Sequence, residues 1–321
     1  MTIGFSRFLN RFKDAIERKY DVDLRLLSDV DYTKSNTLAV YIDYNWRDLF
    51  GRETLLRTIP YEKRVLLLVE PSNVNPTLYL MPWLRNRFNK VITWDKRLAA
   101  KDSRCFLTVV NPFSEPPDYR ENRYSSIKFA DKKLLVAVAG YRRNFMPWSN
   151  YRRRNSVYHY FDDKLPDDFD LYGNWWSPSE FRHVYRGPIT TGISGKIETM
   201  ARYRFALCYE NNAHQPGYVS EKISDCICAR CVPIYYGSEG IEERVPPECF
   251  VNAKQFKSLD EMRDFIVSMP ENEHQKYIDA MDRFCKSDLA KKFTMEYFVD
   301  CFAKALNLKP RIEQKGKAVE Q

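Results

Sequence analysis

Short apolar runs alternate with amphipathic stretches along most of the chain. In the first half, the apolar runs are Leu38–Asp43, Val65–Glu70, Val91–Trp94 and Leu107–Asn111. In the second half, they are Leu134–Gly140, Phe169–Tyr172, Phe205–Tyr209 and Val232–Tyr236. Apolar runs of this length, separated by helical stretches, are typical of parallel strands in an α/β protein. We therefore predict two α/β lobes in tandem, each built on a parallel sheet.

Both ends of the chain are predicted to contain helices. Near the N-terminus, the apolar residues at helical spacing, with basic residues between them, are Phe5, Phe8, Leu9, Phe12 and Ile16. A helix of this kind either packs on the first lobe, which we favour, or lies on a membrane surface. Near the C-terminus, Ser258 and Glu261 fit a capping box, which indicates that a helix begins there.

The stretch Pro112–Asn122 contains a Pro-Pro pair and several charges, and is interpreted as the connection between the lobes. We divide the chain into residues 1–125, residues 126–306 with the terminal helices, and a polar tail of residues 307–321. The length of 321 residues suits two domains, and a hydrophobic content of 44% supplies enough apolar surface for two cores.

The sequence pattern contains no targeting signal that we recognise. No apolar run approaches the roughly 18 residues that a membrane span needs, and Met1–Asp21 carries charges throughout. Eight cysteines without a repeated spacing indicate free thiols in a reducing compartment. We therefore expect a cytoplasmic protein, with the N-terminal helix as the candidate contact with the inner face of a membrane.

The formal net charge is +8, from 51 Lys and Arg against 43 Asp and Glu. This charge permits an anionic partner such as a nucleic acid, a phosphorylated ligand or a membrane, although a solvated basic surface is the commoner cause. The basic cluster Arg152–Arg154 lies in no recognised nucleic-acid-binding motif, so we expect no nucleic acid partner. Cys226, Cys228 and Cys231 lack a fourth ligand at the spacing that a zinc site needs.

One predicted strand ends in polar residues. The run Tyr203–Asn211 is apolar for most of its length and closes with Glu210 and Asn211. In open parallel sheets, ligands bind beyond the carboxyl ends of the strands. These two side chains therefore fall where a ligand would lie.

The helix predicted after Ser220 begins with a charge conflict. Ser220 is a natural N-cap and Glu221 suits the positive end of a helix, but Lys222 in the first turn is repelled by that end. A bound anion would remove this repulsion, and helix N-termini are common phosphate sites. Lys222 either belongs to a diphosphate site or simply extends to water beside Glu221.

The whole run Tyr203–Asn252 resembles the signature of the α1,3/4-fucosyltransferases, glycosyltransferase family ten. The matching blocks are Tyr203-Arg-Phe, Tyr209-Glu-Asn, Tyr218-Val-Ser-Glu-Lys, Val232-Pro-Ile-Tyr-Tyr-Gly and Phe250-Val-Asn. At these places the family has Tyr-Lys-Phe, Phe-Glu-Asn, Tyr-Val-Thr-Glu-Lys, Val/Ile-Pro-Ile-Tyr-Trp-Gly, and Phe-Val-Asn or Phe-Ile-His. The resemblance implies a GT-B fold, in which two Rossmann-like domains face each other. It also implies that the donor GDP-fucose binds residues 126–306, and the acceptor residues 1–125.

Several site residues are implied by the resemblance, position by position. In the family, the Glu and Lys at the helix start bind the ribose and the diphosphate of the donor, which implies these roles for Glu221 and Lys222. Tyr218 and Asn211 would line the same donor site.

Two further roles are implied outside that segment. A donor-binding Arg lies upstream in the family, and Arg182 and Arg186 are both candidates, of which we name Arg182. In the first domain, Val65–Asn73 resembles the family's strand that ends in the proposed general base. This implies the role of base for Glu70.

The implied reaction is inverting transfer of L-fucose from GDP-fucose to a glycan hydroxyl, α1,3 to GlcNAc or Glc of a surface polysaccharide, as in bacterial members. A single displacement needs one base and one diphosphate clamp, so we expect neither a cofactor nor a metal. Asp168-Phe-Asp170 has the spelling of the Asp-x-Asp metal motif of GT-A transferases, but it runs into a stretch that resembles a strand of the family. We interpret it as a strand entry. The alternatives are transfer of another nucleotide sugar and, less favoured, nucleic acid binding.

Overall fold

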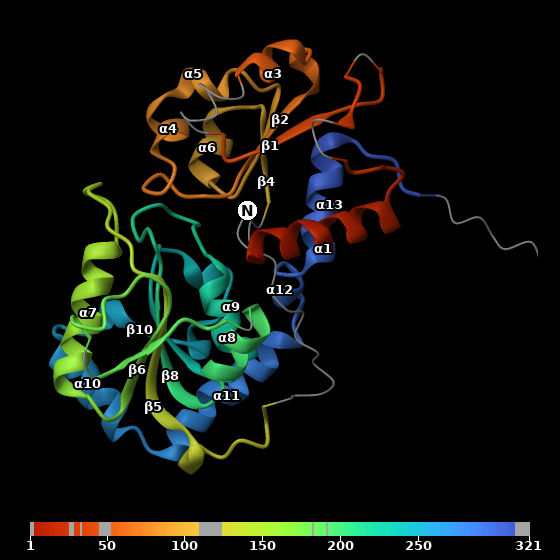
Figure 1. Ribbon diagram of the computed structural model, residues 1–321. Coiled ribbons are helices and arrows are strands. Elements are labelled where there is room, and N and C mark those ends of the chain that lie inside the picture. The colour runs from red at the N-terminus through yellow and green to blue at the C-terminus, as the bar shows by residue number, and fades with distance from the viewer. Residues whose placement is uncertain are drawn as a thin grey trace, which may run out of the picture.

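The computed structural model describes residues 3–25, 29–32, 34–44, 53–108, 124–181, 183–190 and 192–311. The chain forms two α/β lobes, one above the other in Figure 1, each with a parallel sheet. The carboxyl ends of both sheets face the seam between the lobes. This arrangement is the one predicted from the alternation of apolar runs and helices.

The first lobe contains a four-stranded parallel sheet in the order β1-β2-β3-β4. Its strands are β1 (Ala39–Ile42), β2 (Arg64–Leu68), β3 (Lys90–Thr93) and β4 (Cys105–Leu107). Its helices are α3 (Glu53–Thr58), α4 (Pro76–Leu80), α5 (Pro82–Arg85) and α6 (Lys96–Lys101). β4 begins two residues before the predicted run, and residues 109–111 of that run lie outside the described part of the chain.

Both faces of the first sheet are covered, as parallel sheets require. Along β2, Leu66 and Leu68 point into a core shared with α4 and α5, whereas Val65 and Leu67 point to the opposite face. That opposite face is covered by the first and last helices of the chain.

The first helix, α1 (Ile3–Lys19), packs against the last helix, α13 (Met295–Leu306). The ring of Phe12 meets Phe302 edge to face at 5.0 Å and Phe298 at 5.5 Å between centroids. The Nζ atom of Lys90, on β3, donates a hydrogen bond of 2.7 Å to the carbonyl of Ala305. α1 therefore packs on the first lobe, as favoured above, and α13 covers the apolar residues that a membrane would otherwise contact.

The position of α13 corrects one predicted boundary. The domain of residues 126–306 included this helix, but Phe298 and Phe302 are buried with Val65 and Ile92 of the first sheet. The first lobe is thus built from both ends of the chain. Figure 1 shows the blue α13 beside the red α1, away from the sheet of the second lobe.

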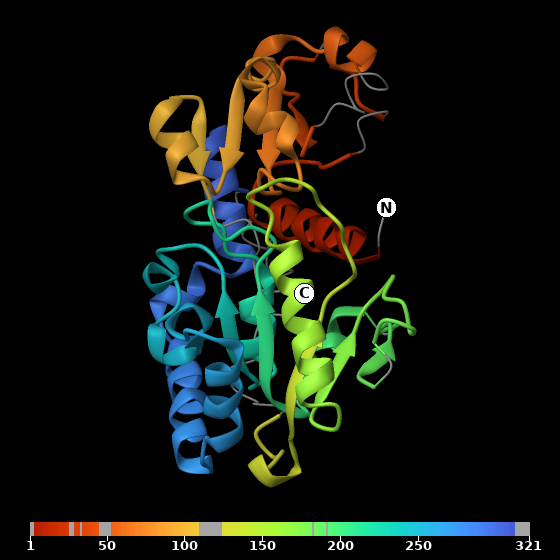
Figure 2. The ribbon, with the colours of Figure 1, turned by 90° about the vertical axis from the view of Figure 1, so that its left-hand side faces the viewer.

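The second lobe contains a six-stranded parallel sheet in the order β10-β9-β8-β5-β6-β7. Its strands are β5 (Lys133–Val138), β6 (Phe169–Tyr172), β7 (Tyr185–Gly187), β8 (Tyr203–Tyr209), β9 (Val232–Tyr236) and β10 (Val251–Asn252). Its helices are α7 (Tyr151–Lys164), α8 (Gly192–Met200), α9 (Glu221–Cys228), α10 (Leu259–Ser268), α11 (Glu271–Cys285) and α12 (Asp288–Lys291). Figure 2 shows α7 crossing in front of this sheet. Four of these strands were predicted; the short β7 and β10 were not.

The strand order of the second sheet reverses at β5. The chain continues from β5 to β6 on one side, whereas β8 pairs with the other side of β5. Ligands of open α/β sheets bind at such a switch point, beyond the carboxyl ends of the strands. A ligand is therefore expected beyond the carboxyl end of β8.

Hydrogen bonds join the two lobes beside the carboxyl end of β8. The side chain of Gln215, in the loop after β8, accepts from Ser72 N at 3.0 Å and donates to Asp95 Oδ2 at 2.6 Å. Asn73 Nδ2 donates to the carbonyl of Asn211 at 3.0 Å. Both partners of Gln215 belong to the first lobe, so the loops of the two lobes hold each other in place.

Several smaller predictions can be compared with the structure. Ser258 Oγ accepts from Glu261 N at 3.1 Å and caps α10, as the capping box predicted. All eight cysteines are free thiols. Within the described residues, no group of three or more His, Cys, Asp or Glu side chains is arranged to hold a metal ion. A search of the same residues for a helix long and apolar enough to cross a bilayer finds none.

Candidate active site

A buried glutamate at the carboxyl end of β8 fixes the start of α9. Glu210 has 0% of its surface exposed. Its carboxylate accepts hydrogen bonds from Ser220 N at 2.7 Å and from Ser220 Oγ at 2.6 Å. The same hydroxyl accepts from Lys222 N at 3.3 Å, which makes Ser220 the N-cap that the sequence predicted. Glu210 thus sets the position of the first turn of α9.

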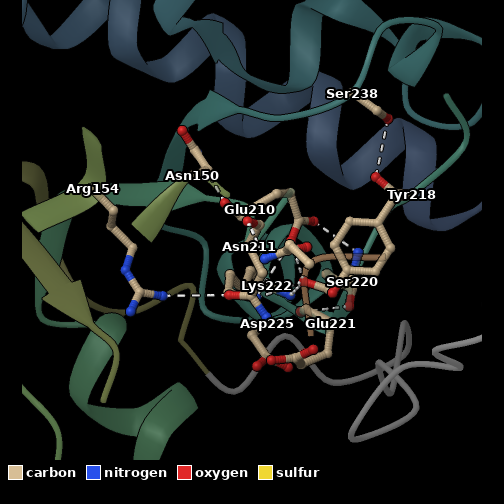
Figure 3. A network of polar contacts seen from close by, with 12 residues as sticks. Asn150, Arg154, Glu210, Asn211, Tyr218, Ser220, Glu221, Lys222, Asp225 and Ser238 are labelled. Carbon is tan, nitrogen blue, oxygen red and sulfur yellow. Dashed lines mark hydrogen bonds and ion pairs between the residues drawn. The ribbon is translucent and has the colours of Figure 1, made fainter. Parts of the chain in front are cut away.

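Lys222 points back toward this cap instead of extending to water (Figure 3). Its Nζ atom lies 3.0 Å from Ser220 Oγ and 3.4 Å from Glu210 Oε2, and its side chain is 16% exposed. Burial lowers the pKa of Lys222, but the charges of Glu221 and Glu210 outweigh burial and raise that pKa above its ordinary value. Lys222 is therefore a fixed cation at the N-terminus of α9.

Glu221 stays ionised beside Lys222. Burial raises its pKa, but the charges of Lys222 and Lys196 oppose burial and bring the pKa down to about 2. Lys196 itself forms an ion pair with Asp225, one turn further along α9, at 2.6 Å between Nζ and Oδ2. The first turn of α9 thus presents one anion and one cation, each with a buried counter-charge.

Asn211 connects the end of β8 to α7 and to the first lobe. Its Oδ1 atom lies 3.4 Å from Arg154 Nη1, and Arg154 Nη2 donates to the carbonyl of Gly140 at 2.8 Å (Figure 3). Arg154 is only 3% exposed, so this member of the basic cluster Arg152–Arg154 belongs to the scaffold of the site. Asn150 Nδ2 supports the same strand end by donating to the carbonyl of Glu210 at 2.9 Å.

Tyr218 is buried at the seam, where it contacts the first lobe. Its ring lies 5.0 Å from the ring of Trp94, and the residue is 4% exposed. Trp94 Nε1 donates to the carbonyl of Val69 at 2.8 Å. Tyr218 therefore supports the backbone next to Glu70 through one aromatic neighbour.

Glu70 lies just beyond β2, beside a second carboxylate. Asp43 Oδ1, at the end of β1, accepts hydrogen bonds from Val69 N at 2.9 Å and from Glu70 N at 3.0 Å. β1 and β2 are parallel neighbours, so their carboxyl ends lie side by side. Asp43 has a φ of 48°, in the left-handed region that Asp tolerates better than most residues.

The surroundings of Glu70 move its pKa toward neutrality. Burial and the charge of Asp43 raise the pKa of Glu70 to about 7, against the opposing charges of Lys222 and Arg142. Burial also raises the pKa of Asp43 to about 6. Ser72 N donates to Gln215 Oε1 at 3.0 Å and Asn73 Nδ2 donates to the carbonyl of Asn211 at 3.0 Å, so the loop after β2 contacts the segment that leads into α9.

Comparison with known proteins identifies the family. A sequence profile described as glycosyltransferase family 10 (fucosyltransferase), C-terminal part, matches residues 144–313, which is more than half of the chain. The chain belongs to glycosyltransferase family 10. The match includes β8, α9 and β9, which carry the blocks on which the resemblance was based.

Two curated relatives share a shorter segment with this family member. The α-(1,3)-fucosyltransferase FucT of Helicobacter pylori is 38% identical over 81 residues, 25% of this chain and 17% of that protein. The α-(1,3)-fucosyltransferase 7 of Mus musculus is 37% identical over 90 residues, 27% of this chain and 23% of that protein. The matched segments thus span less than a quarter of these relatives.

Solved structures share the fold over nearly the whole chain. A crystal structure of an α1,3-fucosyltransferase matches with a TM-score of 0.50 and 15% identity, over 96% of this chain and 100% of that one. The DNA-modifying β-glucosyltransferase matches with a TM-score of 0.58 and 13% identity, over 96% and 95% of the two chains. The predicted GT-B fold is confirmed.

Two arginines, Arg182 and Arg186, were candidates for the residue that binds the donor. Arg182 lies outside the described residues. Arg186, on β7, pairs with Asp170 at 2.6 Å between Nε and Oδ1. Asp170 also accepts from Tyr203 OH at 2.6 Å and Lys133 Nζ at 2.9 Å. Asp170 is thus an ion-paired residue at the start of β6, in agreement with its interpretation as a strand entry.

Sequence reasoning missed two contributors to the site. Asp43 is the last residue of a predicted strand, but its hydrogen bonds go to the backbone beyond a different strand, and only the pairing of β1 with β2 reveals them. Arg142 follows β5 in a loop with one other basic residue, Arg143, and nothing in the sequence distinguishes the two. The position of Asp43 at the carboxyl end of a predicted parallel strand was the one feature of the sequence that could have indicated a place in the site.

Proposed function

We propose that this family member is an inverting fucosyltransferase, which transfers L-fucose from GDP-fucose to a hydroxyl group of a glycan. The observation that carries the proposal is that the loop after β2, which bears Glu70, is hydrogen-bonded to the segment that leads into α9, where Lys222 is held beside Ser220 and Glu210. A base and a diphosphate clamp facing each other across a seam are the two groups that a single displacement needs.

In the proposed reaction, the diphosphate of the donor lies at the N-terminus of α9. Lys222 Nζ and the backbone N–H groups of the first turn supply positive charge there. Negative charge grows on the diphosphate as its bond to the sugar breaks, so fixed donors at this place stabilise the transition state more than the bound donor. Glu221 would bind the ribose, and Asn211 would line the pocket.

Glu70 is the proposed general base. With a pKa of about 7, its carboxylate is ionised at slightly alkaline pH and basic enough to take the proton of an acceptor hydroxyl as the new bond forms. Attack from the side opposite the diphosphate inverts the anomeric centre in one step. Lys222 and α9 provide the charge that a divalent cation provides in GT-A transferases, so we propose that no metal is required.

The acceptor is proposed from the names of the relatives. Both curated relatives described above are named α-(1,3)-fucosyltransferases, which supports an α1,3 linkage. As the acceptor we propose the 3-hydroxyl of GlcNAc or Glc in a surface polysaccharide. We propose that the protein acts on this acceptor in the cytoplasm, at the inner face of a membrane.

A thermal-shift panel tests the donor. GDP and GDP-fucose should raise the melting temperature, because a ligand that binds only the native state stabilises it, whereas UDP and CMP should not. A selective response to another nucleotide would replace GDP-fucose with a different nucleotide sugar. Addition of EDTA should leave the response to GDP unchanged.

A variant of Glu70 tests the chemistry. Glu70→Gln keeps the size of the side chain but cannot accept the proton, so transfer from GDP-fucose should be lost by about 10²–10⁴-fold while GDP binding persists. Glu273→Gln, on the outer helix α11 with 47% of its side chain exposed, is the matched control. Unchanged turnover in Glu70→Gln would remove Glu70 from the role of base.

A further inference from the structure

A groove of about 420 Å³ follows the seam between the two lobes, next to the loop that carries Glu70. From the first lobe it is lined by Tyr79, Arg85, Arg97 and Lys101, and from the second by Trp148 and His214. Tyr79 OH donates to the carbonyl of Glu70 at 3.2 Å, so the wall of the groove touches the base-bearing loop.

The floor of the groove is rigid and fully bonded. Gln215 is 7% exposed and bridges Ser72 and Asp95 of the first lobe, and Asn212 Nδ2 lies 3.3 Å from Ser72 Oγ. Asp95, which is 5% exposed, is the carboxylate in the lining. It accepts from Arg97 N at 2.9 Å and caps α6. The negative charge at the floor is therefore already used by protein donors.

The cationic side chains that line the groove lack ion-pair partners in the described part of the chain, unlike other cationic side chains nearby. Within the described residues, Arg85, Arg97 and Lys101 have no carboxylate within ion-pair distance, whereas Arg104 is paired with Asp102 at 2.6 Å. Lys96, on α6 but not in the lining, is likewise paired, with Glu243 of the second lobe. Arg97 Nη2 donates to the carbonyl of His214 at 3.2 Å, which holds the guanidinium without neutralising it. The lining thus carries three cations against the single carboxylate of Asp95.

We propose that this groove binds an acidic part of the acceptor glycan, a sugar that carries a carboxylate or a sulfate. Arg97 and Lys101 supply charge for the anionic group, and Trp148 and Tyr79 supply flat faces of the kind on which sugar rings stack. The net charge of +8 agrees with an anionic partner. The inference rests on the proposed function, because it gives that function a class of acceptor.

Binding of a matched pair of oligosaccharides tests the groove without requiring transfer. Calorimetry on the full chain, with and without GDP, would compare hyaluronan hexasaccharide, which carries carboxylates, with fully N-acetylated chitohexaose, which is uncharged. The hyaluronan probe should bind at least about tenfold more tightly, and its affinity should fall as salt is raised from about 50 to 300 mM. Equal affinity for the two probes, or no binding of either, would overturn the proposal.

Charge reversal locates the binding on the groove. Lys101 is exposed at the end of the short helix α6, so the Lys101→Glu variant should fold normally and bind the hyaluronan probe more weakly, by about tenfold or more. Arg97→Gln should also lower the affinity for this probe. The control is Lys292→Glu, which changes an exposed lysine that follows the short helix α12. An effect of the control equal to that of Lys101→Glu would place the binding elsewhere and refute the proposal.

Two further measurements separate the possible explanations. An oligo-dT of similar charge that binds as tightly, and loses affinity equally in Lys101→Glu, would make the groove a nucleic acid site and overturn the glycan assignment. The GDP thermal shift reports on the proposed function independently. If GDP fails to bind while hyaluronan still depends on Lys101, the donor assignment falls and the groove remains.

Discussion

The environment of Glu70 predicts an unusually high acid limit for the reaction. Burial and the charge of Asp43 raise the pKa of Glu70 to about 7, whereas an ordinary glutamate has a pKa near 4.5. The base must be ionised to accept a proton, so activity is present above pH 7 and lost as the pH falls through that value. At pH 5, kcat/KM should be about 1% of its plateau; a carboxylate with the ordinary pKa would retain about three-quarters.

Replacement of Asp43 by Asn tests the cause of this shift. The amide oxygen of Asn can still accept the hydrogen bonds that Val69 N and Glu70 N donate to Asp43. The negative charge is removed, however, and this charge helps to raise the pKa of Glu70. The acid limb of Asp43→Asn should therefore move to lower pH, while the plateau rate changes less than in Glu70→Gln.

The assay is kcat/KM for GDP-fucose between pH 5 and 9 at a fixed acceptor concentration, with GDP affinity measured at each pH. If the GDP affinity stays constant while kcat/KM falls, the loss of activity comes from protonation of the base and not from loss of donor binding. Asp288→Asn, at an exposed helix start, serves as the control because its carboxylate lies far along the chain on α12. An acid limb centred near pH 4.5 in the unmodified protein, or an unmoved limb in Asp43→Asn, would refute the reasoning.

Two other substitutions test the clamp and the packing beneath it. Lys222→Ala should weaken the binding of GDP far more than the binding of guanosine, because only GDP has a diphosphate for Lys222 to contact. Calorimetry with both ligands measures the two affinities, and an equal loss of affinity for both would contradict the proposed diphosphate clamp. Gly237→Ala should lower the free energy of unfolding by about 1–3 kcal/mol, since a Cβ there would lie 2.1 Å from the buried hydroxyl of Tyr235. Urea denaturation measures this, and an unchanged midpoint would show that the strand end can adjust.

Most of the sheet architecture could be predicted because the strands are buried on both faces. β6 and β9 have the predicted bounds, Phe169–Tyr172 and Val232–Tyr236, and both runs are almost wholly apolar. β7 and β10 contain only three and two residues, too few for any periodic signal. They are strands only because the neighbouring strand offers free backbone groups at the sheet edge.

The partner of a terminal helix is not encoded in its own pattern. Near the C-terminus, the apolar residues at helical spacing, Phe298, Cys301, Phe302, Ala305 and Leu306, form a stripe that predicts a helix with one buried face, and α13 confirms it. The stripe could not indicate that Phe302 packs on Phe12, because any apolar surface satisfies the same periodicity. The choice depends on contacts between opposite ends of the chain.

Some features of the candidate site depend on neighbouring residues and could be predicted, whereas others depend on contacts between distant residues and could not. Ser220 as N-cap and Lys222 in the first turn are neighbours in sequence, so helix electrostatics alone indicated an anion site there. The carboxylate of Glu210 was expected only to lie near a ligand, yet it binds the cap ten residues further along. The partnership of Asp43 with Glu70 depends on strand pairing, which no local pattern contains.

The return of α13 to the first lobe means that the chain crosses between the lobes twice. The first crossing lies between β4 and β5, and the second between α12 and α13. Two covalent tethers resist twisting of one lobe against the other, but allow opening about the line that joins them. A fragment of residues 1–125 would lose α13 and leave Val65, Leu67 and Ile92 without their cover, so the first lobe cannot be isolated by a single cut.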